Sequence, residues 1–319
     1  MYYLKLINKI ILKLKIKCIR KHIKKVMNKI IIVTGGAGFI GSNMISYLLS
    51  KTDKNIISLD NYSTGQKKNH ITNKRVKYIK ADTTNISKEL DKVKKKICAI
   101  FHFGEFSRIY QSFLKIDDCI NSNATGSNAV FNFCLLNKIK LIYSATSASI
   151  GNNGLDKNLS PYAFTKAKNL EMLENLKKWF NFKYEVIYFY NVFGPNQICK
   201  GDMATVIGIF ENQYKNKKPL TVVRPGTQKR RFTHVKDTVE VCFNAWIQNK
   251  CRHYSISNKK SYTITEVAKM FGGPIKFLPP RPGERYASAL TNMNLSNKIY
   301  KKYGSIQLKD YIISSIKNS

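Results

Sequence analysis

The chain has 319 residues, enough to bury one large α/β domain and a smaller second one. Its 55 Lys and Arg against 19 Asp and Glu give a net charge of +36, but the basic residues are spread along the whole sequence. Such a spread is typical of a solvated surface, so we expect no specific nucleic-acid partner, although the positive field would attract an anionic nucleotide substrate. The seven cysteines form no C-x-x-C pair and no cluster with histidine, which argues against a metal site and favours reduced thiols in a cytoplasmic protein.

Residues 1–27 form a basic extension with nine Lys or Arg and no acidic residue. In one interpretation they form an amphipathic helix that makes weak contact with an anionic membrane surface. In the other, Met27 is the native start and the upstream stretch is an appended extension, since the nucleotide-binding strand already begins at Asn28. We favour the second interpretation, and the apolar run is interrupted too often to span a bilayer.

The segment 34–41, Thr-Gly-Gly-Ala-Gly-Phe-Ile-Gly, is the most informative stretch of the sequence. It follows an apolar strand and opens a helical pattern, Phe39–Leu49. A glycine turn in this setting lets the backbone pass close to a pyrophosphate, which the free N–H groups at the helix start can bind. Gly35 permits the turn, Gly38 the close approach, and Gly41 the packing of helix on strand.

A second apolar strand, Asn55–Leu59, is followed at once by Asp60, an acidic residue at about the spacing from the glycines that ribose binding requires. A carboxylate there accepts a hydrogen bond from the ribose 2'-hydroxyl and repels a 2'-phosphate, so NAD is favoured over NADP. The alternative is that Lys67 and Lys68 fold back to hold a phosphate. We rank it lower because both lie well past the end of the strand.

Short apolar strands alternate with helical stretches up to about residue 190. We expect strands at Ile30–Val33, Asn55–Leu59, Val76–Ile79, Ile97–Phe103, Lys140–Tyr143 and Tyr184–Tyr190, and further helices at Asn123–Leu136 and Pro161–Phe180. This alternation predicts an α/β fold, a Rossmann-type doubly wound parallel sheet with helices on both faces. Beyond Asn191 this alternation ends and the sequence becomes irregular, with frequent Gly and Pro. We therefore predict an NAD-binding domain at 28–190 and a smaller substrate-binding α/β domain at 191–319.

Tyr162 and Lys166 are four residues apart at the start of a predicted helix, so both side chains lie on one face of it. An ammonium group at that distance lowers the pKa of the phenol, and tyrosinate near neutral pH is a usable base. The pair follows a strand that ends in the hydroxyl-rich run 144–149. This run would supply a hydroxyl to a substrate oxygen; the alternative is a Ser/Thr loop that caps a helix.

Taken in order, the motifs resemble those of the extended short-chain dehydrogenase/reductase family, and within it the nucleotide-sugar epimerases such as UDP-glucose 4-epimerase. The resemblance runs from about residue 28 to the end of the chain. Its main segments are T-G-G-A-G-F-I-G (34–41), L-D-N-Y-S-T-G (59–65), F-H-F-G (101–104), S-P-Y-A-F-T-K (160–166), Y-N-V-F-G-P (190–195), R-R-F-T-H-V-K-D (230–237) and R-P-G-E (281–284). It implies NAD as cofactor, a nucleotide sugar as substrate, and a homodimer.

The resemblance also implies roles for individual residues. Tyr162 would be the catalytic base, Lys166 its partner and a ribose ligand, and Thr146, with Ser147 as a neighbouring candidate, the donor to the sugar oxygen. The implied cofactor contacts are Gly35, Gly38, Phe39, Ile40, Gly41, Asp60, Asn61, Asp82 and Lys166, with Asp82 at the adenine. The implied substrate contacts are Asn191, Arg230 and Arg281 at the diphosphate end, and Ser288, whose small side chain would admit a 2-N-acetyl sugar.

Two positions separate an epimerase from a dehydratase. The 4,6-dehydratases of the family carry an Asp-Glu pair directly after the catalytic hydroxyl residue, where this chain has Ser147 and Ala148. Elimination of water therefore lacks its acid and its base. We expect an NAD-dependent epimerase acting at C4 of a UDP-hexose or UDP-N-acetylhexosamine through a keto intermediate. The alternatives are a nucleotide-sugar reductase or 4,6-dehydratase and, in another class, a non-catalytic nucleotide- or RNA-binding protein on this fold.

The sequence departs from the family pattern at a few positions that put the substrate in question more than the catalysis. Arg231 replaces the usual acid of R-D-F, and Phe103-Gly104 replaces an apolar residue followed by Ala. Glu105 follows where a small residue is common. The segment Cys199–Ile207 is similar to the corresponding part of ADP-heptose 6-epimerases.

Overall fold

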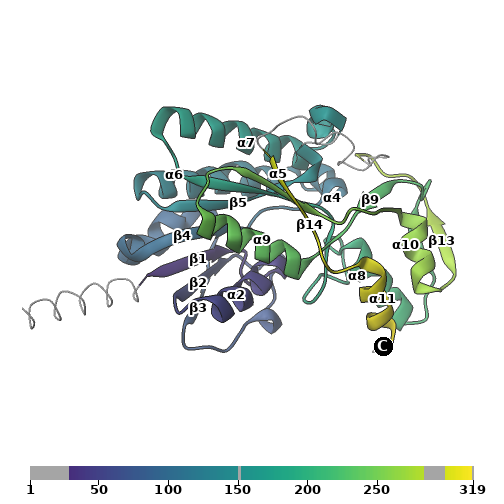
Figure 1. Cartoon of the computed structure of the whole chain (residues 1–319). Coiled ribbons are helices and arrows are strands. Elements are labelled where there is room, and N and C mark those ends of the chain that lie inside the picture. The colour runs from purple at the N-terminus through teal and green to yellow at the C-terminus, as the bar shows by residue number, and fades with distance from the viewer. Residues whose placement is uncertain (1–28, 150–151, 284–298, 318–319) are drawn as a thin grey trace, which may run out of the picture.

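A computed structural model describes residues 29–149, 152–283 and 299–317, and its centre is a parallel sheet of eight strands (Figure 1). The strand order is β14-β11-β6-β5-β4-β1-β2-β3. The strands are β1 (Ile30–Thr34), β2 (Asn55–Asp60), β3 (Val76–Lys80), β4 (Ile97–His102), β5 (Lys140–Thr146), β6 (Tyr184–Phe189), β11 (His253–Ser257) and β14 (Ile299–Tyr303). The six strands expected from the sequence are confirmed, and β5 runs on into the hydroxyl-rich segment as far as Thr146.

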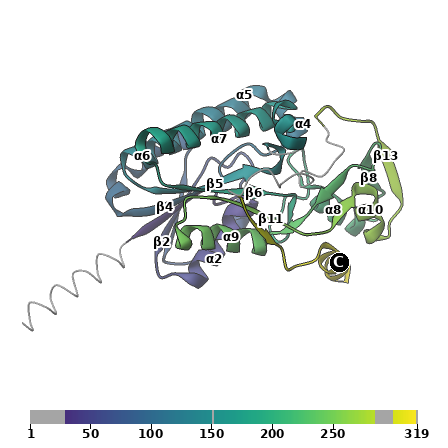
Figure 2. The same cartoon turned by 45° about the horizontal axis from the view of Figure 1, so that its top comes forward.

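Helices cover both faces of the sheet, as Figures 1 and 2 show, which confirms the predicted fold class. One face carries α2 (Phe39–Lys51) and α9 (Val235–Gln248), and the other α3 (Ile86–Leu90), α6 (Ser127–Leu136) and α7 (Pro161–Phe180). Two short helices, α4 (Ile109–Leu114) and α5 (Ile116–Ile120), pack against α7. In β1, Ile31 and Val33 face the α2 side while Ile32 faces the α6 side, so this strand is apolar on both faces.

The helix expected at Asn123–Leu136 begins differently from the prediction, because a π-helical turn, Asn121–Gly126, precedes α6. Asn123 is buried there, and its carbonyl accepts a hydrogen bond of 2.6 Å from the Asn169 side chain. The Asn123 amide in turn donates to Phe106 O at 3.1 Å. These bonds from neighbouring segments draw the backbone into the wider turn, a feature common at functional sites.

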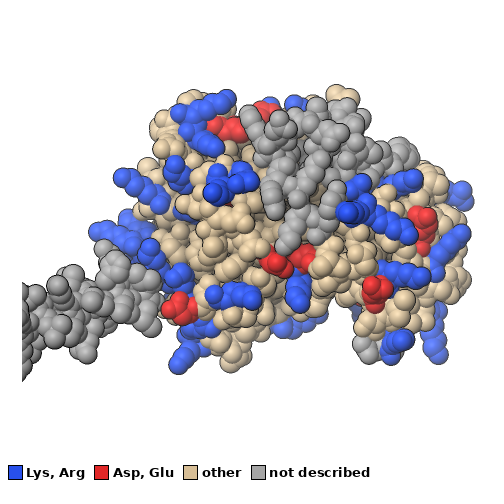
Figure 3. Space-filling model, viewed as in Figure 1, with Lys and Arg blue, Asp and Glu red and all other residues tan. Residues whose placement is uncertain are grey.

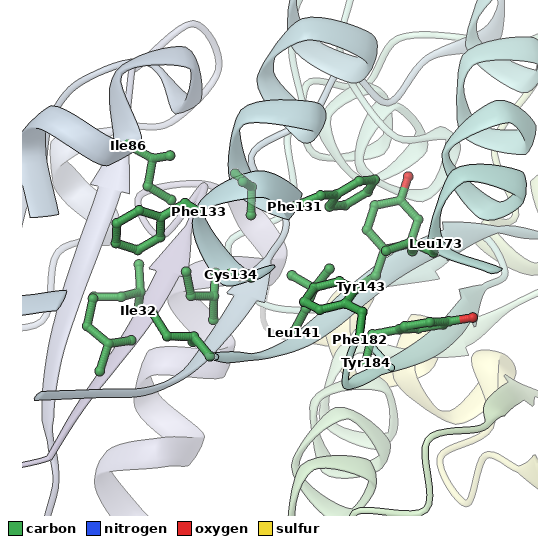
Figure 4. Packing of buried hydrophobic residues seen from close by; sticks show 14 of the residues in the cluster. Ile32, Ile86, Phe131, Phe133, Cys134, Leu141, Tyr143, Leu173, Phe182 and Tyr184 are labelled. Carbon is green, nitrogen blue, oxygen red and sulfur yellow. The ribbon is translucent and has the colours of Figure 1, made fainter. Parts of the chain in front are cut away.

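The core between the sheet and α6 and α7 is closely packed (Figure 4). The Tyr143 ring meets Phe131 edge to face, with ring centroids 5.5 Å apart, and Leu173 of α7 lies beside them. Burying a side chain of this size contributes about 1.5–3 kcal/mol. This packing fixes α7, and with it the side chains at its N-terminal end, relative to the carboxyl end of β5.

A smaller part of the molecule, built from residues after 191, has an apolar core of its own (Figure 1). Its helices are α8 (Val206–Lys215), α10 (Ile264–Phe271) and α11 (Leu308–Lys317). Its strand pairs are β7 (Val192–Phe193) with β10 (Thr233–His234), β9 (Lys229–Arg231) with β12 (Ser261–Thr263), and β8 (Leu220–Val223) with β13 (Ile275–Leu278). Residues after 191 also supply α9, β11 and β14 to the large sheet. A division of the chain at residue 190 stays a prediction.

Basic side chains are scattered over both parts of the molecule on the face seen in Figure 3, with no single dense patch. Within the described ranges no helix is long and apolar enough to cross a membrane. The same ranges hold no group of three or more His, Cys, Asp or Glu arranged to bind a metal ion. The basic extension 1–27 lies outside the described residues, so its predicted membrane contact stays a prediction.

Candidate active site

A cavity of about 960 Å³ lies at the carboxyl ends of the central strands, where parallel α/β sheets usually bind their ligands. It is lined by residues of both parts of the molecule. Among them are Gly35, Gly38, Phe39, Ile40, Gly41, Asp60, Asn61, Asp82, Thr146, Tyr162, Lys166, Asn191, Arg230 and Arg281. The structure thus brings together every site residue predicted from the sequence except Ser288, which lies outside the described residues. Their individual roles stay predictions.

The glycine turn between β1 and α2 has no room for a side chain at Gly35 or Gly41. Gly35 has φ +68°, and a Cβ on it would lie 2.8 Å from the backbone nitrogen of Gly104. A Cβ on Gly41 would overlap the carbonyl group of Gly35. The turn is completed by a hydrogen bond of 3.0 Å from Gly38 N to Gly35 O, and Gly38 is the N-cap of α2. Bare backbone and the start of α2 therefore face the cavity, as pyrophosphate binding requires.

Asp60 ends β2, and its carboxylate is held by the backbone. Oδ2 accepts from Ala37 N at 2.9 Å and Oδ1 accepts from Tyr62 N at 2.8 Å. Burial raises the pKa of Asp60, although these bonds act in the opposite direction. A carboxylate can accept about four hydrogen bonds, so the group fits a ribose hydroxyl as well as these amides. Lys67 and Lys68, the alternative phosphate ligands, are exposed and lie outside the residues that line the cavity.

Asp82 and Asn61 bind one another beside this cofactor end of the cavity. Asn61 Nδ2 donates to Asp82 Oδ2 at 2.9 Å, and Asp82 Oδ1 caps the next turn by accepting from Thr84 N at 3.0 Å. Burial by itself would raise the pKa of Asp82, but these hydrogen bonds outweigh it and lower the pKa. Asp82 is thus an ionised acceptor whose side chain is already oriented.

Tyr162 and Lys166 lie in the first turns of α7, which starts where the sequence predicts. Ser160 caps the helix by accepting from Ala163 N at 3.0 Å, and Pro161 occupies the first helical position. The Lys166 side chain is buried, and its ammonium group donates to the Ser144 carbonyl and to the Glu105 carboxylate. Burial lowers the pKa of Lys166, whereas the negative charge of Glu105 acts to raise it.

Thr146, the predicted hydroxyl donor, is the last residue of β5. Its Oγ1 accepts from Ala148 N at 3.2 Å, which leaves the hydroxyl proton available to a substrate oxygen. Ser147 follows in a short 3-10 turn, is buried, and lines the same cavity. Both hydroxyl candidates therefore reach the cavity, and the arrangement combines a phenol, an ammonium group and a hydroxyl next to the glycine turn. Such a set can take a proton from a carbinol and stabilise the oxygen left behind.

Comparison with known proteins places this arrangement in a family. The sequence profile of the NAD dependent epimerase/dehydratase family matches residues 31–257. The chain belongs to this family. A curated relative, the ADP-L-glycero-D-manno-heptose-6-epimerase of Brachyspira hyodysenteriae, is 29% identical in an alignment of 255 positions that covers 75% of this chain and 79% of the relative.

Solved structures of the extended short-chain dehydrogenase/reductase type show the same fold. The UDP-N-acetylglucosamine 4-epimerase of Methanobrevibacter ruminantium superposes with a TM-score of 0.79 at 27% identity, covering 91% of this chain and 97% of that one. The UDP-glucose 4-epimerase of Thermus thermophilus, solved with NAD, gives 0.78 at 21% identity and covers 90% and 98%. NAD is the family's cofactor, and the glycine turn and Asp60 of this chain fit it.

At the opposite end of the cavity, this family member presents the amide side chain of Asn191 and two arginines of its smaller part. Asn191 is held in a left-handed conformation with φ +33°, and its Nδ2 donates to Arg231 O at 2.8 Å. Arg230 of β9 is almost fully buried. The Arg281 guanidinium lies over the Tyr110 ring, 5.2 Å from its centroid. Such groups suit a phosphate-bearing substrate.

The cavity also holds charged residues that received no role from the sequence, among them Glu105 and Arg108. Glu105 stood out only as a departure from the family pattern, whereas Arg108 gave no signal at all. Arg108 donates to the Met203 carbonyl through Nε at 3.0 Å and Nη2 at 2.6 Å. Burial lowers its pKa, and the nearby phenol of Tyr162 acts to raise it. Only the folded chain brings these groups together, since Met203 is distant in sequence.

Proposed function

We propose that this chain is an NAD-dependent epimerase of a nucleotide sugar. The observation that carries the proposal is that Tyr162, Lys166 and Thr146 line the same cavity as the glycine turn and Asp60. A cofactor bound at the turn would have its reactive end close to these three side chains. Bound NAD would supply the acceptor and donor of a hydride.

The chain's own residues would handle the protons and the geometry. Tyr162 takes the proton from the sugar hydroxyl while its carbon is oxidised, and returns it when the carbon is reduced. Thr146 donates a hydrogen bond to the carbonyl oxygen that forms in between. Lys166 holds the ribose and favours the ionised phenol. Inversion requires the keto sugar to turn over in the cavity before reduction, and the cavity of about 960 Å³ is of the size that small-molecule sites have.

The chain lacks the groups that an elimination would need. Ser147 and Ala148 stand where a 4,6-dehydratase carries an acid and a base, and both are buried within the cavity wall. Neither side chain titrates in the pH range of an enzyme. These residues support an epimerase or a simple reductase over a dehydratase.

For the sugar we propose an ADP-heptose, inverted at C6. The curated relative reported above and others of similar identity are ADP-heptose 6-epimerases, and the segment 199–207, which is similar to theirs, contributes Gly201, Asp202 and Met203 to the cavity wall. The UDP-hexose or UDP-N-acetylhexosamine substrate, inverted at C4, is the second candidate. It is supported by the 27% identity to the UDP-N-acetylglucosamine 4-epimerase over nearly the whole chain.

One experiment tests the function and the sugar together. Purified protein with NAD is incubated with ADP-heptose, UDP-glucose, UDP-N-acetylglucosamine and a GDP-sugar, and the products are identified by NMR. We expect one substrate to interconvert with its epimer without net change in nicotinamide absorbance. Net formation of NADH from NAD in this incubation, or stoichiometric consumption of NADH in a parallel incubation that contains it, would instead identify a reductase. If no sugar reacts and the protein only binds RNA or nucleotides, the enzyme proposal is wrong.

We also propose that the chain forms a homodimer through one helical face. α4, α5 and α7 lie on the same side of the molecule (Figure 2). They expose large apolar side chains. These are Phe113, Leu114, Ile116, Ile120, Phe164 and Met172. Apolar exposure of this kind on neighbouring elements marks association surfaces. Light scattering should report a dimer for the full chain and a monomer for Leu114→Glu, whereas an unchanged mass would exclude this face.

A further inference from the structure

The Glu105 carboxylate lies inside the protein and accepts hydrogen bonds from several directions. Its side chain is 3% exposed and forms an ion pair with Lys166. Three neutral donors bind Oε1: Ser127 Oγ at 2.7 Å, Tyr143 OH at 3.0 Å and Asn169 Nδ2 at 3.3 Å. A buried carboxylate with this many donors is fully ionised and fixed in place.

The hydrogen bonds around Glu105 also have a defined direction. An ionised carboxylate only accepts, so the Ser127 hydroxyl must donate to it. Ser127 Oγ therefore accepts from His102 Nε2, 3.0 Å away, which assigns the proton of the neutral imidazole to Nε2. His102 Nδ1 then accepts from Thr34 Oγ1 at 2.7 Å. A single chain of hydrogen bonds joins the start of the glycine turn to the catalytic lysine.

We propose that Glu105 is a positioning residue for the reaction: its negative charge holds the Lys166 ammonium group against the Ser144 carbonyl, beside Tyr162 and the glycine turn. The inference rests on the proposed function, since it assigns a task within the same site. Glu105 belongs to the loop after β4 and lines the cavity, yet its carboxylate is turned to the lysine and its donors. It acts through Lys166 and does not need to touch the sugar.

The charge of Glu105 should set the pH range in which the enzyme works. The titratable groups that interact with it come from β4 (His102), α5 (Cys119), β5 (Tyr143) and α7 (Lys166). Arg108 and Tyr162 line the same cavity and act on one another. Burial keeps His102, Cys119 and Tyr143 neutral at working pH, because it lowers the pKa of the imidazole to about 4 and raises those of the thiol and the phenol. The charges that remain are those of Glu105, Lys166, Arg108 and ionised Tyr162.

Loss of the Glu105 charge should change the pKa of both Tyr162 and Lys166, and with them the pH profile of activity. Activity requires Tyr162 to be ionised, which sets the acid limb of the pH profile, and Lys166 to be protonated, which sets the alkaline limb. Without the negative charge of Glu105, the phenol loses its proton more easily and its pKa falls. The ammonium group also loses its proton more easily, because its counter-ion is gone and it is buried. Both limbs should therefore move to lower pH.

The decisive variant is Glu105→Gln, which keeps the shape of the side chain and removes its charge. We expect the profile of kcat/KM against pH to move to lower pH at both limbs by about one unit, as removal of a close charge typically produces. The matched control is Ser127→Ala, which removes a neutral donor from the same carboxylate. It should leave both limbs where the wild type has them. A Glu105→Gln profile that is lowered uniformly, with both limbs in place, would overturn the inference.

A second measurement needs no sugar. The tyrosinate absorbance of the NAD complex is titrated with pH for the chain with and without Tyr162→Phe, and the difference reports Tyr162 alone. In the Glu105→Gln background this titration should occur at lower pH. If no nucleotide sugar reacts, the proposed function fails while this titration still tests Glu105. If sugars react and the titration does not move, the inference about Glu105 fails alone.

Should Glu105→Gln fail to fold, Glu105→Asp answers the same question. Asp keeps the charge but is one methylene shorter, so Lys166 is held less well while its electrostatic surroundings persist. We expect a lower kcat with both limbs at their wild-type pH. If the acid and alkaline limbs of the pH profile shift in Glu105→Asp, the charge at this position does not control them.

Discussion

The two ends of the cavity are built in different ways. At the cofactor end, backbone amides and buried side chains fix one another: the glycine turn excludes side chains, and Asp60 is held by Ala37 N and Tyr62 N. At the opposite end, where we propose that the sugar nucleotide binds and which we call the sugar end, Arg230 and Arg281 extend from a short strand and a loop of the smaller part. The cofactor end is thus formed mainly by backbone groups in a geometry that suits one cofactor. The sugar end depends on a few side chains, so exchange of those residues can change the sugar and leave the chemistry intact.

The largest expected effect tests the chemistry that lies between the two ends. Tyr162→Phe removes the base and should lower kcat by about 10³-fold. NAD affinity, which belongs to the cofactor end, should stay within twofold, as calorimetry can show. Tyr110→Phe, at another tyrosine of the cavity wall, is the matched control and should keep its activity. Turnover by Tyr162→Phe at a tenth or more of the wild-type rate would exclude Tyr162 as the base.

His102, near the cofactor end, should make the free energy of unfolding fall in acid. Burial lowers the pKa of His102 to about 4, from 6.5 for an ordinary histidine. The unfolded chain therefore takes up this proton as the pH falls below 6.5, whereas the folded chain does so only near 4. The associated stability is fully present above pH 6.5 and is lost towards pH 4, by at most about 3 kcal/mol. Urea titrations from pH 7 to 4 measure it, and His102→Gln should lack this part of the pH dependence. Equal slopes in the two proteins would contradict the assignment.

A pair of glycine substitutions compares the two ends directly. Gly41→Ala places a methyl group on the backbone of Gly35 and should cost about 2 kcal/mol of folding free energy together with most NAD affinity. Gly201, at the sugar end, has a positive φ but open space around it. Gly201→Ala should cost about 1 kcal/mol and leave NAD binding unchanged. Urea unfolding and NAD titration of both variants test this, and a loss of NAD affinity in Gly201→Ala would contradict the comparison.

The smallest expected effect concerns the sugar end alone. Arg281→Ala removes one cation facing the cavity and should raise KM for the nucleotide sugar about tenfold, with kcat within twofold. Arg252 offers a matched control because it also lies over a tyrosine ring, 5.9 Å from the centroid of Tyr254, but does not line the cavity. Arg252→Ala should leave KM unchanged. A lower kcat with an unchanged KM in Arg281→Ala would place this arginine in the chemical step.

Much of the cofactor end could be predicted because its signals are local. A strand, a glycine turn and a helix follow one another directly, and Asp60 stands at the end of the next strand. The same holds for Tyr162 and Lys166, whose spacing on one helix fixes their common face. Each of these inferences needs only the periodicity of a single element.

The rest could not be predicted, because it depends on contacts between distant segments. Glu105 meets Lys166 across 61 positions of sequence and Arg108 meets Met203 across 95, and no periodic pattern links either pair. The sequence also did not predict that residues after 191 add two strands, β11 and β14, to the large sheet. β11 and β14 follow the irregular region after Asn191, where the alternation of strands and helices is no longer visible.

The return of the chain to the large sheet after residue 191 makes the two parts hard to separate. α9, β11 and β14 come after residue 191 but pack on or extend the large sheet, while α11, which follows β14, belongs to the core of the smaller part. A recombinant fragment that stops at residue 190 would leave β6 as a bare edge and the apolar face under α9 open to water. It should aggregate instead of binding NAD. A protease cut in one connecting loop would, for the same reason, leave both pieces noncovalently joined.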